Sequence, residues 1–239
     1  TDSLYVGCSA SVVAGGLGYP GATTAACSSP AFTFPGTTVG GAVGRQGGSH
    51  GGAGGSITGR AEYGNIFAPY EAGGGGGCGS VYLGDGGAGG GVVRIRSGGA
   101  VQIDGSVGAD GRSGPHGGGA GGSIWIEAAR VGGSATLSAR GGSGYVSCSS
   151  SNLTASGGGG RIAVYAGSVD RSLIDRADVS SASACRKGAT GTVYLRLDDQ
   201  PFGELIVDAR DRSTTPTYLP AIGSGTVDAV EVDAFTDNE

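Results

Sequence analysis

Two histidines occupy matching places in this chain. His50 and His116 each stand directly before a run of small residues, 51–55 and 117–122 respectively. An imidazole titrates near neutral pH and can serve as a base or as a metal ligand. Because catalysis rarely needs a group that the architecture duplicates, the repetition favours a structural role in which each ring bonds loop carbonyls.

The cysteines indicate an oxidising compartment. Five are spread along the sequence, none in a C-x-x-C pair and none close to a histidine, so the spacing does not favour zinc. Cys8 and Cys27 bracket an N-terminal loop and make sense as a disulfide, as do Cys148 and Cys185 around a later strand unit. Cys78 is then left as a free thiol or as an intermolecular partner. The sequence itself does not fix the connectivity.

Asn152 is a candidate modification site. It begins an Asn-Leu-Thr triplet in a serine-rich loop, and this triplet is an acceptor for N-linked glycosylation. The cysteines and the presence of a single lysine, Lys187, also favour an extracellular chain. We therefore expect a glycoprotein located outside the cell or at the cell surface.

The carboxylates show no metal-binding pattern. Asp170, Asp175 and Asp178 are interspersed with arginines, which is typical of a solvated face. Asp198 and Asp199 follow an alternating segment and could join a metal site, but their spacing does not support one. The tandem nonapeptide of calcium-binding β-rolls does not occur in the sequence. We expect no metal, no cofactor and no catalytic residue.

Glycine dominates the elements that must position these residues. The chain has 55 glycines among 239 residues, and much of this glycine lies in nearly pure blocks. Several blocks precede an alternating apolar segment, which is the pattern of half-buried β-strands bounded by glycine. The matching positions Ala53, Ala88, Ala120, Gly158 and Ala189 are 35, 32, 38 and 31 residues apart, which is solenoid spacing.

The repeat predicts an all-β fold, a right-handed parallel β-helix or solenoid with stacked polyglycine segments. One repeat buries too little apolar surface to be stable alone, so neighbours must stack. Blocks without side chains can adopt an extended helix like polyproline II and approach closely enough to exchange backbone hydrogen bonds. The residues expected to point inward are Val81, Leu83, Val93, Ile95, Val101, Ile103, Ile124, Ile126, Ala135, Leu137, Ile162, Val164, Val193 and Leu195.

Two aromatic residues are expected on the outward side of their strands. Trp125 and Tyr194 alternate with the apolar positions on either side of them. From there they could dock sugars or a neighbouring subunit. Packing of these rings against the glycine blocks is an equally good interpretation.

The chain divides into three parts by composition. Residues 1–38 are expected to form an irregular, cysteine-containing segment, and residues 39–198 the glycine-rich solenoid. After Asp198 the density of glycine falls while alternation persists. Residues 199–239 are therefore expected to continue the solenoid or to form a small β module.

Charge and hydropathy exclude several kinds of partner. The formal net charge is −5 and the arginines are scattered singly, so nucleic acid is not expected to bind. No apolar run approaches the ~20 residues that span a bilayer, so we expect no membrane insertion. The sequence has no initiator Met and no signal peptide, and we expect a mature or trimmed piece of a longer protein.

The order of motifs resembles a known kind of repeat region. It is similar to the glycine-rich repeats of large secreted or cell-surface proteins of bacteria, algae, oomycetes and plants, such as filament proteins of flagellar hairs (mastigonemes). The resemblance implies an extracellular architectural module and carries no active site, and the loop 8–27 has no counterpart in it. The segments that carry it are 49–55, 63–65, 69–70, 73–77, 92–95, 123–126 and 161–165.

These observations predict a structural protein and not an enzyme. We expect a secreted module that builds a surface filament or a wall-associated assembly, through self-association or with other filament or surface proteins. One alternative is an adhesin, a module that binds glycans. Another is a polysaccharide lyase or hydrolase on a β-helix, which would need carboxylates and an arginine or lysine to converge on one face; the scattered acids argue against it.

Overall fold

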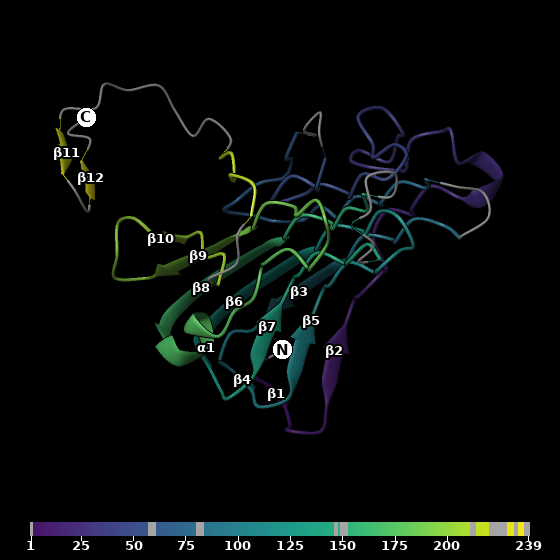
Figure 1. The fold of residues 1–239 in the computed structure, drawn as a ribbon. Helices are drawn as coiled ribbons and strands as arrows, with labels where there is room; N and C mark the ends of the chain where they lie inside the picture. Colours follow the sequence, from purple (N-terminus) through teal and green to yellow (C-terminus); the bar gives the residue numbers. More distant parts are fainter. Residues whose placement is uncertain are drawn as a thin grey trace.

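Two sheets of mostly parallel strands form the framework (Figure 1). The computed structural model describes residues 2–56, 61–79, 84–145, 148, 153–210 and 214–219, and the strand residues 229–231 and 234–236. The elements are β1 (Leu4–Val6), β2 (Ser11–Val13), η1 (Thr24–Ala26), β3 (Val92–Arg96), β4 (Ala100–Ile103), β5 (Ser106–Gly108), β6 (Ser123–Gly132), β7 (Thr136–Ser138), β8 (Arg161–Val169), α1 (Arg171–Asp175), β9 (Thr192–Leu197), β10 (Glu204–Ile206), β11 (Ala229–Glu231) and β12 (Ala234–Thr236).

The larger sheet, called the main sheet, has the strand order β1-β4-β6-β8-β9-β10. β6 is long, and it pairs with β3 through its first half and with β4 through its second half. The smaller sheet has the order β2-β5-β7 and is parallel throughout. Residues 1–38, expected to be irregular, thus contribute β1 and β2, which pair with β4 and β5.

The register of the main sheet follows the sequence repeat. Val93, Ile124, Ile162 and Val193 are direct neighbours across β3, β6, β8 and β9. Side chains alternate between the two faces of a strand, so these residues all point to the same side. They pack with residues of the smaller sheet and of α1 in one apolar core. The predicted inward positions are buried wherever the structure describes them; Val81 and Leu83 lie outside the described residues.

The predicted right-handed parallel β-helix or solenoid was wrong. The described strands form a mixed main sheet, a small parallel sheet and an antiparallel pair of β11 and β12, and they do not close into a solenoid. β10 runs antiparallel to β9, because the short link 198–203 suffices for a hairpin but not for the crossover of about a dozen residues that a parallel strand needs. In addition, the described residues between β2 and β3 contain no strand, so this long stretch completes no coil.

Glycine segments from distant parts of the chain pack on one another beyond the ends of the strands (Figure 1). We call residues 47–55, 73–77, 86–91, 117–122 and 157–160 the glycine layer. The N–H of Gly48 donates to the carbonyl of Gly118 at 2.9 Å, and the N–H of Gly158 donates to that of Gly48 at 3.0 Å. These bonds, together with bonds to adjoining segments such as the one from Gly119 to the carbonyl of Arg112, satisfy buried polar groups of these backbones.

The close approach of these backbones requires the absence of side chains. A Cβ added at Gly119 would overlap the carbonyl group of Ala88, and one added at Gly158 would overlap that of Gly52. These neighbouring carbonyl groups belong to the backbone and cannot rotate away as a side chain could. The composition of the layer therefore follows from its packing, in the way that only glycine fits a crowded backbone contact.

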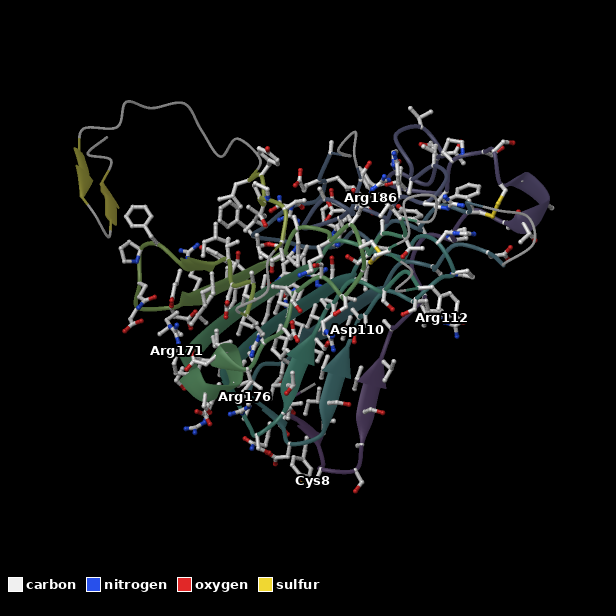
Figure 2. The ribbon with its side chains drawn as sticks, viewed as in Figure 1. Cys8, Asp110, Arg112, Arg171, Arg176 and Arg186 are labelled. Carbon is white, nitrogen blue, oxygen red and sulfur yellow. A yellow bond between two sulfur atoms is a disulfide. The ribbon has the colours of Figure 1, made fainter. Side chains whose placement is uncertain are left out.

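The disulfides correct part of the predicted pairing. Cys148 is bonded to Cys185, as predicted, but Cys27 is bonded to Cys78. The predicted Cys8–Cys27 pair was wrong, and so was the prediction that Cys78 is left over. Cys8 carries a free, exposed thiol in the turn between β1 and β2 (Figure 2). Cys27 and Cys78 are 51 residues apart in sequence, and they meet because the N-terminal loop packs against the glycine layer. Two disulfides fit a protein of an oxidising, extracellular environment.

Candidate functional site

The outer face of the main sheet carries the polar and aromatic side chains. Alternation along β6 and β8 places their apolar residues inside, so Ser123, Trp125, Arg161 and Tyr165 stand on the outer side. Because the strands are in register, Ser123 and Arg161 are cross-strand neighbours and both belong to one row of the sheet. Trp125 belongs to the next row, which continues to Tyr194 on β9.

Arg161 is the centre of a buried group that we call the polar cluster, comprising His50, Tyr63, Glu71, Ser123, Arg161 and Thr192. Its side chain is 1% exposed. The Nε and Nη2 atoms donate to the carbonyl oxygen of Tyr63 at 3.1 and 3.0 Å, and Nη1 donates to Oγ1 of Thr192 at 3.1 Å. Arg161 thereby fastens the loop around Tyr63 to two strands of the main sheet.

Glu71 supplies the negative charge of the polar cluster. Its carboxylate is almost fully buried and accepts hydrogen bonds from the N–H groups of Asn65 and Tyr70 at 3.3 and 3.2 Å. Its carbonyl oxygen accepts a hydrogen bond from the Ser123 hydroxyl at 2.6 Å. Burial lowers the pKa of Arg161 to about 10, while Glu71 acts in the opposite direction, so the guanidinium remains charged at neutral pH.

Gly64 allows these groups to converge. Its φ is +93°, a conformation that favours glycine. A Cβ at this position would lie 3.0 Å from Nε2 of His50, 3.1 Å from Oε2 of Glu71 and 3.3 Å from Nε of Arg161. A larger residue would push the loop away from the polar cluster.

His50 joins the polar cluster to the glycine layer. Its Nδ1 is 2.8 Å from the carbonyl oxygen of Gly121, so Nδ1 carries the proton and donates. Burial, reinforced by the charge of Arg161, lowers the pKa of His50 to about 3, and the ring is neutral at pH 7. The ring thus bonds a carbonyl, as predicted for a structural histidine.

His116 does not repeat this arrangement. It is buried next to another glycine segment, but neither ring nitrogen makes a hydrogen bond with a described residue. Burial, together with the charge of Arg45, lowers its pKa. The two histidines are therefore equivalent in the sequence repeat but differ in their contacts.

An aromatic groove lies beside the polar cluster on the same face. It is lined by Phe67, Tyr165, Tyr194, Arg196, Pro201, Phe202, Gly203 and Leu205. The ring centroids of Phe67 and Tyr194 are 4.8 Å apart in an edge-to-face arrangement, and those of Tyr165 and Tyr194 are 5.7 Å apart. The Tyr165 hydroxyl donates to the carbonyl oxygen of Phe67 at 2.8 Å, which holds this loop against the sheet.

The predicted outward residues have different surroundings. Trp125 is half-buried and its ring lies under the guanidinium of Arg94, at 4.0 Å from the ring centroid. Tyr194 is largely buried and forms the floor of the aromatic groove, where it packs against Gly203. Trp125 is packed with the same rings, in an apolar cluster that also holds Ile66.

The remaining predicted site residues are dispersed. Asn152 lies outside the described residues. Asp175 forms an exposed ion pair with Arg171, and Asp178 is 3.5 Å from Arg140. Within the described ranges, no group of histidine, cysteine and carboxylate side chains is arranged to hold a metal ion.

Sequence reasoning missed Arg161, Glu71 and the aromatic pair Phe67 and Tyr165. Arg161 follows a glycine block at an outward strand position, where an arginine is ordinarily exposed. A signal for Glu71 was its place two residues before the block 73–77, in a short segment where Tyr63, Gly64 and Asn65 also occur.

Comparisons with known proteins found no matching family model, no similar curated protein and no similar solved structure. Within the described part of the chain, no helix has the length and apolarity that crossing a bilayer requires. The function has to be inferred from the geometry of the chain itself.

Proposed function

We propose that this chain is an extracellular structural module that contributes to a surface filament or a wall-associated assembly. The glycine layer is the observation that carries the proposal. A layer held by backbone hydrogen bonds, in which a methyl group cannot be added without overlap, restricts movement of the segments that compose it. Such a layer provides stiffness.

The polar cluster supports the same role. Its charged members, Glu71 and Arg161, are 5% and 1% exposed, so a polymeric substrate would not reach them. The Glu71 carboxylate accepts from the N–H of Asn65 within the loop 61–71, while the side chains of Arg161 on β8 and Ser123 on β6 donate to the backbone carbonyls of Tyr63 and Glu71 in that loop. We infer that the polar cluster fixes the loop 61–71 and the glycine layer to the main sheet, and we propose no catalytic role for it.

The two disulfides support placement outside the cell. Each bond joins segments far apart in sequence, and long loops closed by a disulfide lose the most entropy in the unfolded chain. An assembly exposed to mechanical load and to varying conditions benefits from such bonds. Glycosylation at Asn152 and association with other surface proteins belong to this proposal.

Electron microscopy of the secreted, glycosylated chain tests the proposal. We expect regular fibres or sheets, and we expect a Gly119→Val variant to abolish them. The matched control is Gly98→Val, because a Cβ at Gly98 would meet no atom within 4 Å. Monomeric particles at every concentration, measured by light scattering on the same sample, would contradict the assembly.

A further inference from the structure

The aromatic groove has the dimensions and composition of a ligand site. Its volume is about 450 Å³, within the range of about 300–1,000 Å³ that is usual for small-molecule sites. It is lined mainly by rings and apolar side chains, with one charged residue among its lining residues, Arg196. This is the pattern of a site in which apolar surface gives affinity and one polar group gives orientation.

Two rings of the groove, those of Phe202 and Phe67, are accessible to solvent and are not buried in the apolar core. Phe202 is 83% exposed and Phe67 is 39% exposed. The ring of Tyr194 packs against Phe67, and Tyr165 packs against Tyr194 and donates its hydroxyl to the carbonyl oxygen of Phe67. The flat faces of these rings suit a ligand with flat apolar faces of its own, such as the C–H face of a pyranose.

The charge around the groove selects among such ligands. The row Arg96, Glu127, Tyr165 and Arg196 runs across β3, β6, β8 and β9. Glu127 is already engaged, at 3.5 Å from Arg94 and 3.5 Å from Arg96. Asp198 stands on the next outer row, where its carboxylate is directed toward Gly167, and it does not line the groove.

Arg196 itself is exposed, and it forms no ion pair with another described residue. A guanidinium presents a planar set of donors that matches a carboxylate or a sulfate in a bidentate manner. An exposed arginine that lines a groove of aromatic rings, with no ion-pair partner among the described residues, favours an anionic ligand at this place despite the formal net charge of −5.

We propose that the aromatic groove binds anionic polysaccharides, with pyranose rings packed on Phe202 and Phe67 and a carboxylate or sulfate paired with Arg196. Neutral sugars would use the rings without the ion pair and bind more weakly. This binding is independent of the structural role of the glycine layer, which lies on other segments of the chain.

Calorimetric titration of the full chain with defined hexasaccharides tests the proposal. The ligands are a hexamer of galacturonate, a sulfated galactan hexamer and neutral cellohexaose, with polyglutamate of matching charge as a non-sugar anion. We expect at least one anionic hexamer to bind ten-fold or more tightly than cellohexaose and polyglutamate. The tighter-binding anionic hexamer shows whether Arg196 pairs with a carboxylate or with a sulfate.

Matched variants assign the binding to the groove. Phe202→Ala and Arg196→Gln are expected to weaken the anionic hexamer at least ten-fold, and Arg196→Gln to remove the preference over cellohexaose. The controls are Tyr5→Ala, an aromatic residue 66% exposed on the opposite edge strand, and Arg112→Gln on the opposite side of the molecule (Figure 2). Both controls should bind like the unmodified chain, and all variants should retain its thermal midpoint.

Several results would overturn the proposal. Absence of binding by every hexamer would do so, as would equal affinity for polyglutamate, which would indicate attraction to charge alone. Equal losses in Phe202→Ala and Tyr5→Ala would place binding elsewhere. If no hexamer bound but electron microscopy still showed regular fibres, the binding proposal would be wrong and the structural proposal would be unaffected. The two proposals can therefore fail separately.

Discussion

The glycine layer and the apolar core are both buried, but they are held together in opposite ways. In the core, Ile124, Leu137 and Ile162 have no exposed surface, and the removal of their side chains from water stabilises the fold. In the glycine layer, Gly119 and Gly158 have no side chains to bury, and stability depends on backbone hydrogen bonds between segments. One region gains from the volume of its residues, and the other requires that volume to be absent.

This difference predicts different tolerance to substitution. A core side chain can change rotamer or be replaced by one of similar volume at small cost. Atoms of a backbone cannot move without breaking the hydrogen bonds they make, so the glycine layer has no comparable freedom. Adding atoms should therefore be more harmful in the glycine layer than removing them is in the core.

The largest effect is expected for Gly119→Val. Its Cβ would overlap the carbonyl of Ala88, and the segments 86–91 and 117–122 would have to separate. The free energy of unfolding, measured with urea, should fall by more than about 4 kcal/mol, which is exceptional for one substitution. Gly98→Val, at an exposed position with free space, should change it by about 0.5 kcal/mol or less. Similar losses in the two variants would show that the layer is not tightly packed.

A smaller but substantial effect is expected when the core loses volume. Leu137→Ala should lower the free energy of unfolding by about 3 kcal/mol, from lost burial and the cavity that remains, and Ile162→Val by about 1 kcal/mol. Gly158→Ala adds a single carbon and should nevertheless destabilise more than Leu137→Ala, because the carbonyl of Gly52 occupies the space. Urea titration gives the free energy of unfolding of the three variants. An unchanged value for Gly158→Ala would contradict the expectation that added atoms are more harmful in the glycine layer than lost atoms are in the core.

The junction between the two regions should respond to pH. His50 has a pKa of about 3 in the folded chain against 6.5 when exposed, so the unfolded chain binds its proton first as the pH falls. Stability from the neutral ring is complete above pH 6.5 and declines below it by about 1.4 kcal/mol per pH unit, or about 2 kcal/mol at pH 5.

His50→Asn is the variant that isolates this effect. Asparagine can still donate to the carbonyl of Gly121 but does not titrate, so its stability should fall less between pH 7 and pH 5. The measurement is urea unfolding of both proteins at the two pH values, in which the carboxylates contribute equally and cancel. Parallel losses in the two proteins would show that protonation of His50 is not coupled to folding.

The strands and their interior could be predicted from the sequence because a simple alternation encodes them. Ile124 and Ile162 belong to segments in which every second residue is apolar, and a parallel register places them side by side. The glycine blocks marked the repeat through their composition, which is visible directly in the sequence. Both signals are local and survive without knowledge of the rest of the chain.

The features that were missed depend on contacts between distant segments. Cys27 meets Cys78 across 51 residues, and no spacing rule distinguishes this pair from a pair with the nearer Cys8. The antiparallel turn into β10 depends on a link too short for a crossover, whereas the alternation of Glu204–Ile206 is the same in either direction. Arg161 is buried where the loop around Tyr63, distant in sequence, packs over it.

The smallest effect is expected for a surface contact that belongs neither to the glycine layer nor to the apolar core. Arg171 of α1 pairs in bidentate fashion with Glu204 of β10, at 2.5 and 2.9 Å, and the hydrogen bonds raise the pKa of Arg171. Both side chains are about half exposed, so Glu204→Gln should lower the free energy of unfolding by less than about 1 kcal/mol, and by almost nothing in 1 M salt. Asp175→Asn, which removes the other carboxylate of Arg171, is the matched control and should behave alike. A loss as large as that of Leu137→Ala would mean that this contact between α1 and β10 is part of the packed structure, and the division into two supporting regions would have to include a third.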